Sequence, residues 1–167
     1  EKSRDTAVAK RLLGENFAGY LISDRWSAYN FVAPSQRQLC WSHLSRDFKG
    51  FSDLGPQAEA VSVKLQELVH TMFHEWHRFQ RGELSRKDFQ EFMKPIQSDI
   101  EIFLIEGTSI VPIARKCKGI LRLKDALWTF VNVEDVEPTN NRAERTVRHG
   151  VLWRKGCFGT DSPSGSR

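Results

Sequence analysis

The chain has 167 residues, of which 40% are hydrophobic, so it can bury the core of one domain, and wholesale disorder is excluded. Its net charge of +4 is compatible with binding to nucleic acid but does not require it. Three cysteines without close pairing argue against a disulfide framework, and the absence of a signal peptide or a long apolar run argues against export and membrane insertion.

A helix and a short strand are expected at the start of the chain. Apolar side chains recur near helical spacing over residues 5–14, and Gly14 can end that helix. The apolar run over residues 17–23 predicts a buried strand. Asp24 then lies at the carboxyl end of this strand, which is the edge where α/β sheets gather ligands. Residues 26–31 are expected to begin another short helix.

A second strand and a second helix follow in the expected order. Pro34 and Ser35 break the preceding helix. Residues 38–41 are expected to form the strand, and residues 42–51 are expected to turn helical after it. A loop is expected over residues 50–56.

The middle of the chain is expected to be helical throughout. Apolar stripes at helical spacing predict long helices over residues 57–80 and 85–106, joined by a turn at residues 81–82. Pro95 is expected to kink or split the second of them. A third helix is expected over residues 114–131.

The end of the chain returns to polar and charged residues. Thr139 or Asn140 can cap a helix that carries Glu144. Residues 152–159 are expected to be extended or hairpin-like. The order of elements therefore predicts an α/β core with a helical insertion.

One carboxylate in the stretch NNRAERTVR, residues 140–148, lies among three arginines. Glu144 is flanked by Arg142, Arg145 and Arg148. This pattern is typical of a site that binds an anion and a cation together, such as a phosphodiester and its metal ion. The alternatives are a helical ion pair of Glu144 with Arg148 and a turn-forming role for Asp24. The hypothesis is that Asp24 and Glu144 meet in space.

Two histidine patterns raise weaker metal hypotheses. Cys40-x-x-His43 supplies two zinc ligands, but no companion pair follows at zinc-finger spacing, so a packed cysteine and a half-buried histidine are the alternative. His70, His74 and His77 share one helix face, which can bind metal or can be the polar edge of an amphipathic helix.

Basic residues concentrate near the end of the chain and suggest contacts with phosphates. Trp153 and Phe158 are interleaved with them and could stack on unpaired bases, whereas a solvated face with core aromatics is the alternative. Arg46 is a further candidate for DNA contact. The cluster consists of Arg142, Arg145, Arg148, His149, Arg154 and Lys155. A second basic stretch is expected to be an ordinary helix surface, and it contains Lys116, Lys118, Arg122 and Lys124.

Three segments in the same order resemble the transposases of the insertion-sequence 66 family. They are LISDRWSAYN over residues 21–30, QLCWSHLSRDF over residues 38–48, and TNNRAERTVR over residues 139–148. These transposases are bacterial DDE-type enzymes with a ribonuclease-H-like catalytic core. The resemblance covers most of the chain and includes a helical segment between the second and third motifs.

The resemblance implies a fold and a domain organisation. The fold class is α/β, with a partial ribonuclease-H-like core whose first strands are absent and an all-helical insertion. Residues 1–54 would form the first part of the core, residues 55–113 the insertion, and residues 114–167 the returning core helices with a truncated C-terminal extension. The chain is accordingly expected to be a segment of a longer protein.

The resemblance also implies a catalytic triad of Asp, Asp and Glu. Asp24 matches the second acid and Glu144 the third, while the first is expected upstream of this chain, since Asp5 lacks the surrounding motif. The activity of the segment alone is therefore left open. The two acids would hold two Mg²⁺ or Mn²⁺ ions, and His43 would orient a phosphate or a catalytic carboxylate.

The expected function is metal-dependent cleavage and strand transfer that moves a bacterial insertion sequence. The expected partners are the DNA of the element ends and of the target, a second copy of the protein, and accessory proteins of the same element. No membrane is expected, and the expected location is the bacterial cytoplasm at the nucleoid. The alternatives are a non-catalytic DNA-binding or assembly remnant and a related nuclease.

Overall fold

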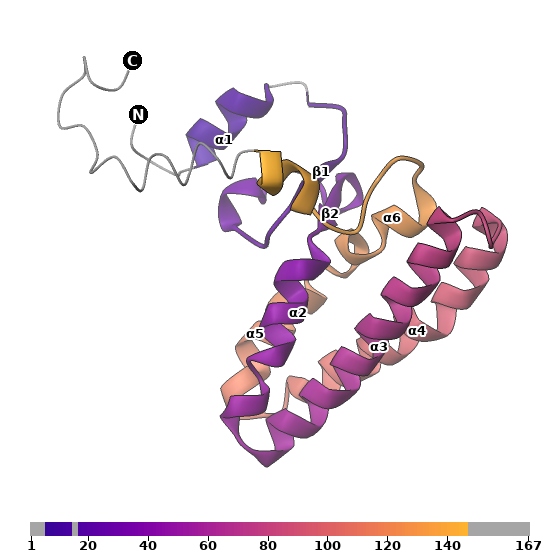
Figure 1. Cartoon of the computed structure of the whole chain (residues 1–167). Helices are drawn as coiled ribbons and strands as arrows, with labels where there is room; N and C mark the ends of the chain where they lie inside the picture. The colour runs from indigo at the N-terminus through magenta and orange to yellow at the C-terminus, as the bar shows by residue number, and fades with distance from the viewer. Residues whose placement is uncertain (1–5, 15–16, 147–167) are drawn as a thin grey trace.

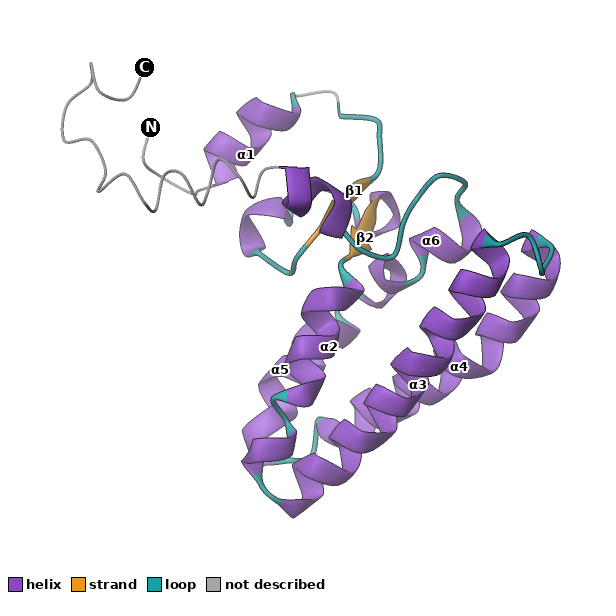
Figure 2. Ribbon diagram, in the orientation of Figure 1, coloured by secondary structure: helices purple, strands orange, loops and turns teal. Residues whose placement is uncertain are grey.

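The computed structural model of the chain describes residues 6–14 and 17–146, which are mostly helical and contain a small two-stranded sheet (Figures 1 and 2). The α-helices are α1 (Thr6–Leu13), α2 (Trp41–Lys49), α3 (Pro56–Gln80), α4 (Arg86–Gly107), α5 (Val111–Leu121) and α6 (Thr129–Asn132). The strands are β1 (Leu21–Ser23) and β2 (Arg37–Leu39). Single 3₁₀ turns are η1 (Ser27–Tyr29), η2 (Pro34–Gln36), η3 (Ser52–Leu54) and η4 (Lys124–Leu127).

The two strands pair in parallel, with Leu21 opposite Arg37 and Ser23 opposite Leu39. The backbone N–H of Cys40 extends the ladder by donating to the carbonyl of Ser23 at 2.8 Å. Both strands are shorter than the runs predicted over residues 17–23 and 38–41. Trp41 begins α2 instead of ending β2, and its N–H donates to the carbonyl of Pro138 at 2.9 Å.

Side chains on β2 bind the chain segment that follows α5. The buried amide of Gln38 donates to the carbonyl of Leu127 at 3.0 Å and accepts from the N–H of Phe130 at 2.9 Å. The hydroxyl of Thr129 donates to the carbonyl of Arg37 at 2.5 Å. These bonds satisfy buried polar groups that would otherwise be costly to leave unpaired.

The same bonds explain why the helix predicted over residues 114–131 is wrong. The structure has three separate pieces in that range, namely α5, η4 and α6. Trp41 adds a further constraint, because its indole N–H donates to the carbonyl of Leu127 at 2.9 Å. A carbonyl used in this way cannot continue a regular helix ladder, so the chain turns where it contacts β2 and α2.

The two long predicted helices are confirmed as α3 and α4, which lie side by side (Figure 1). Gly82, with a φ of 75°, lies in the turn between them, and the hydroxyl of Ser85 caps α4 by accepting from the N–H of Asp88 at 3.1 Å. Pro95 does not split α4. Its neighbours Met93 and Ile96 are buried, so packing on the core side holds the helix across the proline.

One cluster of buried apolar residues joins the first helices to the last. It includes Phe48 of α2, Leu65 of α3, Met93 of α4 and Phe130 of α6. No helix in the described part is long and apolar enough to cross a bilayer. The parallel pair of strands surrounded by helices is compatible with an α/β fold, whereas the ribonuclease-H-like core and the boundaries at residues 54 and 113 remain predictions.

Candidate functional site

Asp24 directly follows β1, as predicted, at the carboxyl end of the strand. Its Oδ1 accepts a hydrogen bond from the backbone N–H of Trp26 at 3.0 Å. This bond closes a tight turn that holds the carboxylate at the sheet edge. The turn role that was the alternative for Asp24 is therefore present, and it leaves the second carboxylate oxygen for other partners.

His43 reaches the same edge from the first turn of α2. The helix begins there because β2 ends at Leu39 and the buried Cys40 takes the N-cap position. Nδ1 of His43 is buried and has no hydrogen-bond partner among the described residues. A buried imidazole nitrogen without a partner marks a place where a further group is expected to bind.

Glu144 lies on a helical segment, residues 141–146, which packs next to the start of α2. The N–H of Glu144 donates to the carbonyl of Asn140 at 3.0 Å, and the side chain of Asn141 donates to the hydroxyl of Ser42 at 2.9 Å. Oε1 of Glu144 lies 3.8 Å from Nε2 of His43. The structure therefore brings the second and third motifs into contact.

A pocket of about 960 Å³ is lined by both His43 and Asp24. Its lining includes Asp24, His43, Arg46 and Asn140, and the rest of its wall comes largely from α1 and β1. Oδ1 of Asn140 is buried without a hydrogen-bond partner among the described residues. Asp24 and His43 thus line one cavity, and Glu144 lies beside that cavity because it contacts His43.

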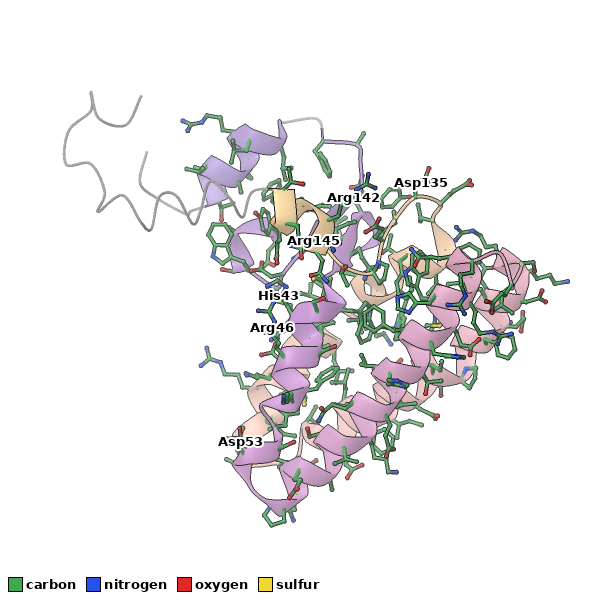
Figure 3. All side chains as sticks on the ribbon, viewed as in Figure 1. His43, Arg46, Asp53, Asp135, Arg142 and Arg145 are labelled. Carbon is green, nitrogen blue, oxygen red and sulfur yellow. The ribbon has the colours of Figure 1, made fainter. Side chains whose placement is uncertain are left out.

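The predicted DNA-binding residues fall into two groups. Arg46 lines the pocket, and Arg142 and Arg145 are exposed on the segment that carries Glu144; Figure 3 shows these arginines along the same side of the molecule as His43. The guanidinium of Arg142 lies 3.9 Å from the carboxylate of Glu137. The other predicted residues lie outside the described part of the chain, and they are Arg148, Arg154 and Lys155, together with His149, Trp153 and Phe158.

Arg25 and Arg37 were not predicted as site residues, yet both lie next to Asp24. Nη2 of Arg37 donates to the carbonyl of Asp24 at 3.3 Å, and Arg25 forms an ion pair with Asp47 in α2. Arg37 is fully buried, and this burial lowers the pKa of its guanidinium, whereas the charge of Asp24 opposes that effect. Arg37 lies just before the strand predicted over residues 38–41 and is the first residue of the observed β2, so little in the sequence pointed to this position.

The described residues contain no group of three or more His, Cys, Asp or Glu side chains placed to hold a metal ion. The hypothesis of a metal site at His70, His74 and His77 therefore has no support. Two of these side chains have other partners, since His74 contacts Glu75 at 2.9 Å and His77 stacks on Phe73. A zinc site at Cys40 and His43 has none either, since Cys40 is a buried free thiol.

The oxygen donors at the pocket are of the kind that Mg²⁺ prefers. Asp24 lines the pocket with a carboxylate, and Asn140 lines it with an Oδ1 that has no partner among the described residues. The carboxylate of Glu144 lies beside the pocket, next to His43. This set fits part of the coordination of a hard divalent cation and requires a further acidic ligand to complete a three-carboxylate site.

The family model described as the transposase IS66 family matches residues 1–167. Neither the search of curated proteins nor the search of solved structures found a match.

Proposed function

The chain belongs to the transposase IS66 family, and from this membership we propose that the pocket lined by Asp24 and His43 is part of a centre that cleaves and joins DNA phosphodiester bonds. The observation that carries the proposal is the contact of Glu144 with His43 beside the cavity that Asp24 lines. Residues from three separate segments, each part of a family motif, converge there.

In this role Asp24 and Glu144 hold divalent cations, Mg²⁺ or Mn²⁺, with two ions expected and Asn140 as a further oxygen donor. Two such ions, when bound, supply charge neutralisation at the attacking and leaving oxygens of the phosphate. The first acid of the triad is the one that the family resemblance assigns to a position upstream of Asp24.

His43 acts as a positioning residue for Glu144. The 3.8 Å separation between Nε2 and Oε1 is too long for a hydrogen bond, so the interaction is electrostatic when the imidazole carries a proton on both nitrogens. Arg46, exposed on α2 at the edge of the pocket, adds positive charge where a phosphate would approach.

The test replaces each acid by its amide in the complete natural polypeptide. We expect Asp24→Asn and Glu144→Gln each to lower DNA cleavage by about 100-fold or more, because the carboxylate charge is lost while the side-chain shape is kept. Cleavage and joining of a labelled duplex carrying the element end are measured on denaturing gels with Mg²⁺.

Asp53→Asn is the matched control, since Asp53 is an exposed acid in η3, at the other end of α2 from His43 (Figure 3). We expect this variant to retain full activity. Full activity of Asp24→Asn or Glu144→Gln would overturn the proposal.

The same assay separates the alternatives. Cleavage followed by joining of a 3′-hydroxyl end to target DNA identifies a transposase. Cleavage without joining identifies a nuclease, and DNA binding without either reaction identifies a non-catalytic remnant.

A further inference from the structure

A second pocket, of about 640 Å³, lies next to the candidate catalytic pocket and is strongly basic. Five cationic side chains line it, and no acidic side chain does; they are Arg25, Arg37, Arg115, Lys116 and Arg122. Arg25 lines both pockets. The two cavities therefore share a wall.

Little of this positive charge is neutralised by neighbouring carboxylates. Asp47 alone pairs with both Arg25 and Lys116, with a 3.0 Å contact from Nζ of Lys116. Arg115 and Arg122 form no ion pair within the described residues and are exposed. The pocket therefore keeps an excess of positive charge that would attract an anion.

Arg37 supplies a buried cation at the inner side of this pocket. Its two terminal nitrogens donate to neutral oxygens, the carbonyl of Asp24 at 3.3 Å and Oδ1 of Asn30 at 3.4 Å. Its Nε is buried and has no hydrogen-bond partner among the described residues. The charge of Asp24 offsets part of the cost of burying this guanidinium, and Nε remains able to donate to a further acceptor.

Two guanidinium groups converge at Gly119 of α5. A Cβ placed on Gly119 would lie 3.6 Å from Nη1 of Arg25 and 4.0 Å from Nη2 of Arg122. Both nitrogens lie close to the same point, so they are no further apart than the sum of these two distances, and an oxyanion held between them would accept charge-assisted hydrogen bonds from both groups.

The lining favours a phosphate group over a nucleobase. No aromatic side chain lines the pocket, so nothing there can stack on a base. Arginine and lysine contacts of this kind bind phosphates without reading sequence.

We propose that this basic pocket binds a backbone phosphate of the DNA whose neighbouring phosphodiester occupies the candidate catalytic pocket, with Arg25 between the two. The inference rests on the proposed function for the identity of the DNA as substrate. It assigns a contact role to Arg115 and Arg122. Of these two residues, Arg122 belongs to the basic stretch that was expected to be an ordinary helix surface.

The test measures binding of the 167-residue chain to a fluorescein-labelled duplex of arbitrary sequence by fluorescence anisotropy, in EDTA and at several salt concentrations. We expect Arg115→Gln combined with Arg122→Gln to weaken binding about tenfold or more and to reduce the slope of log K against log salt by about 1 to 2. Lys64→Gln combined with Lys87→Gln removes the same charge from exposed sites on α3 and α4 and should change binding far less.

Gly119 offers a second pair of variants. Gly119→Glu places a carboxylate between the two guanidiniums and should weaken DNA binding as much as the double arginine variant. Gly119→Ala adds only a Cβ in ordinary van der Waals contact and should bind like the parent chain. Circular dichroism checks that each variant is folded.

The outcomes separate this inference from the proposed function. Unchanged binding by both the arginine and the Gly119→Glu variants overturns the inference, even if the natural protein cleaves DNA. Loss of binding by these variants, with binding retained in Asp24→Asn, supports it even if cleavage is absent. Titration with inorganic phosphate alone tests a free-phosphate site, and tight binding of phosphate with no effect of the variants on DNA binding also overturns the inference.

Discussion

Asp24 has a structural role in the turn that follows β1, in addition to the catalytic role that we propose for it. Oδ1 closes the turn to Trp26, which leaves the carboxylate held at the edge of the sheet. Asparagine keeps that Oδ1 acceptor and removes only the charge. The amide variant is therefore a sharper probe of catalysis than alanine, which would also break the turn.

At the residue scale, Cys117 predicts a pH dependence of stability. The thiol is buried in α5, and burial raises its pKa to about 11 from an ordinary value near 9. Above pH 9 the unfolded chain loses this proton before the folded chain does, so stability falls as pH rises from about 9 to 11. The loss should be on the order of 2 kcal/mol.

Urea unfolding of the parent chain and of Cys117→Ala across this pH range measures the effect. Other groups titrate alike in both proteins. We therefore expect the difference in the free energy of unfolding between the parent chain and Cys117→Ala to become smaller as pH rises. A difference that stays constant with pH would show that the thiol does not ionise on unfolding.

At the element scale, the packing of α4 on α5 depends on a glycine. A Cβ on Gly107 would lie 2.6 Å from Sγ of Cys117 and 3.3 Å from Cδ1 of Ile113. We expect Gly107→Ala to destabilise the fold by about 1–3 kcal/mol, because a well-packed contact cannot accept the extra methyl group.

A double-mutant cycle checks the cause of that loss. Cys117→Ala removes the sulfur atom, so Gly107→Ala should cost clearly less in that background, with a coupling of about 1 kcal/mol. Equal costs of Gly107→Ala in both backgrounds, measured by urea unfolding, would exclude the sulfur contact as the cause.

At the scale of the whole molecule, the helical hairpin of α3 and α4 shares its core with the segments that form the candidate site. The ring of Phe89 in α4 packs at a tilt of 56° against that of Phe130 in α6, with ring centroids 6.1 Å apart. The hydroxyl of Ser62 in α3 donates to the carbonyl of Phe48 in α2 at 2.6 Å. The segment that was predicted to be an insertion therefore contributes to one common hydrophobic core.

We therefore expect that replacing residues 57–106 with a short Gly-Ser linker will unfold the remainder of the chain. Near-ultraviolet circular dichroism and the urea transition report this loss of packing. Insertion of Gly-Ser after Gly82, in the exposed turn, is the control and should leave the fold intact. A folded linker variant would show that the rest of the chain does not depend on the hairpin for its core.

Local patterns in the sequence predicted most of the elements. The periodicity of apolar residues predicted α1, α3 and α4 closely, because amphipathic spacing is a property of neighbouring residues alone. The position of Asp24 after a strand followed from the same local signal. The family motifs pointed to Glu144 and His43 because these residues lie within short recognisable segments.

Contacts between distant segments were decided only by the tertiary structure. The break between α5 and α6 depends on Gln38 and Trp41, whose bonds to Leu127 no local pattern reveals. The same is true of the basic pocket, in which cations from the start of the chain meet those of α5 around Gly119. Helix spacing is a local property of the chain, whereas a pocket between distant segments exists only after the core has brought them together.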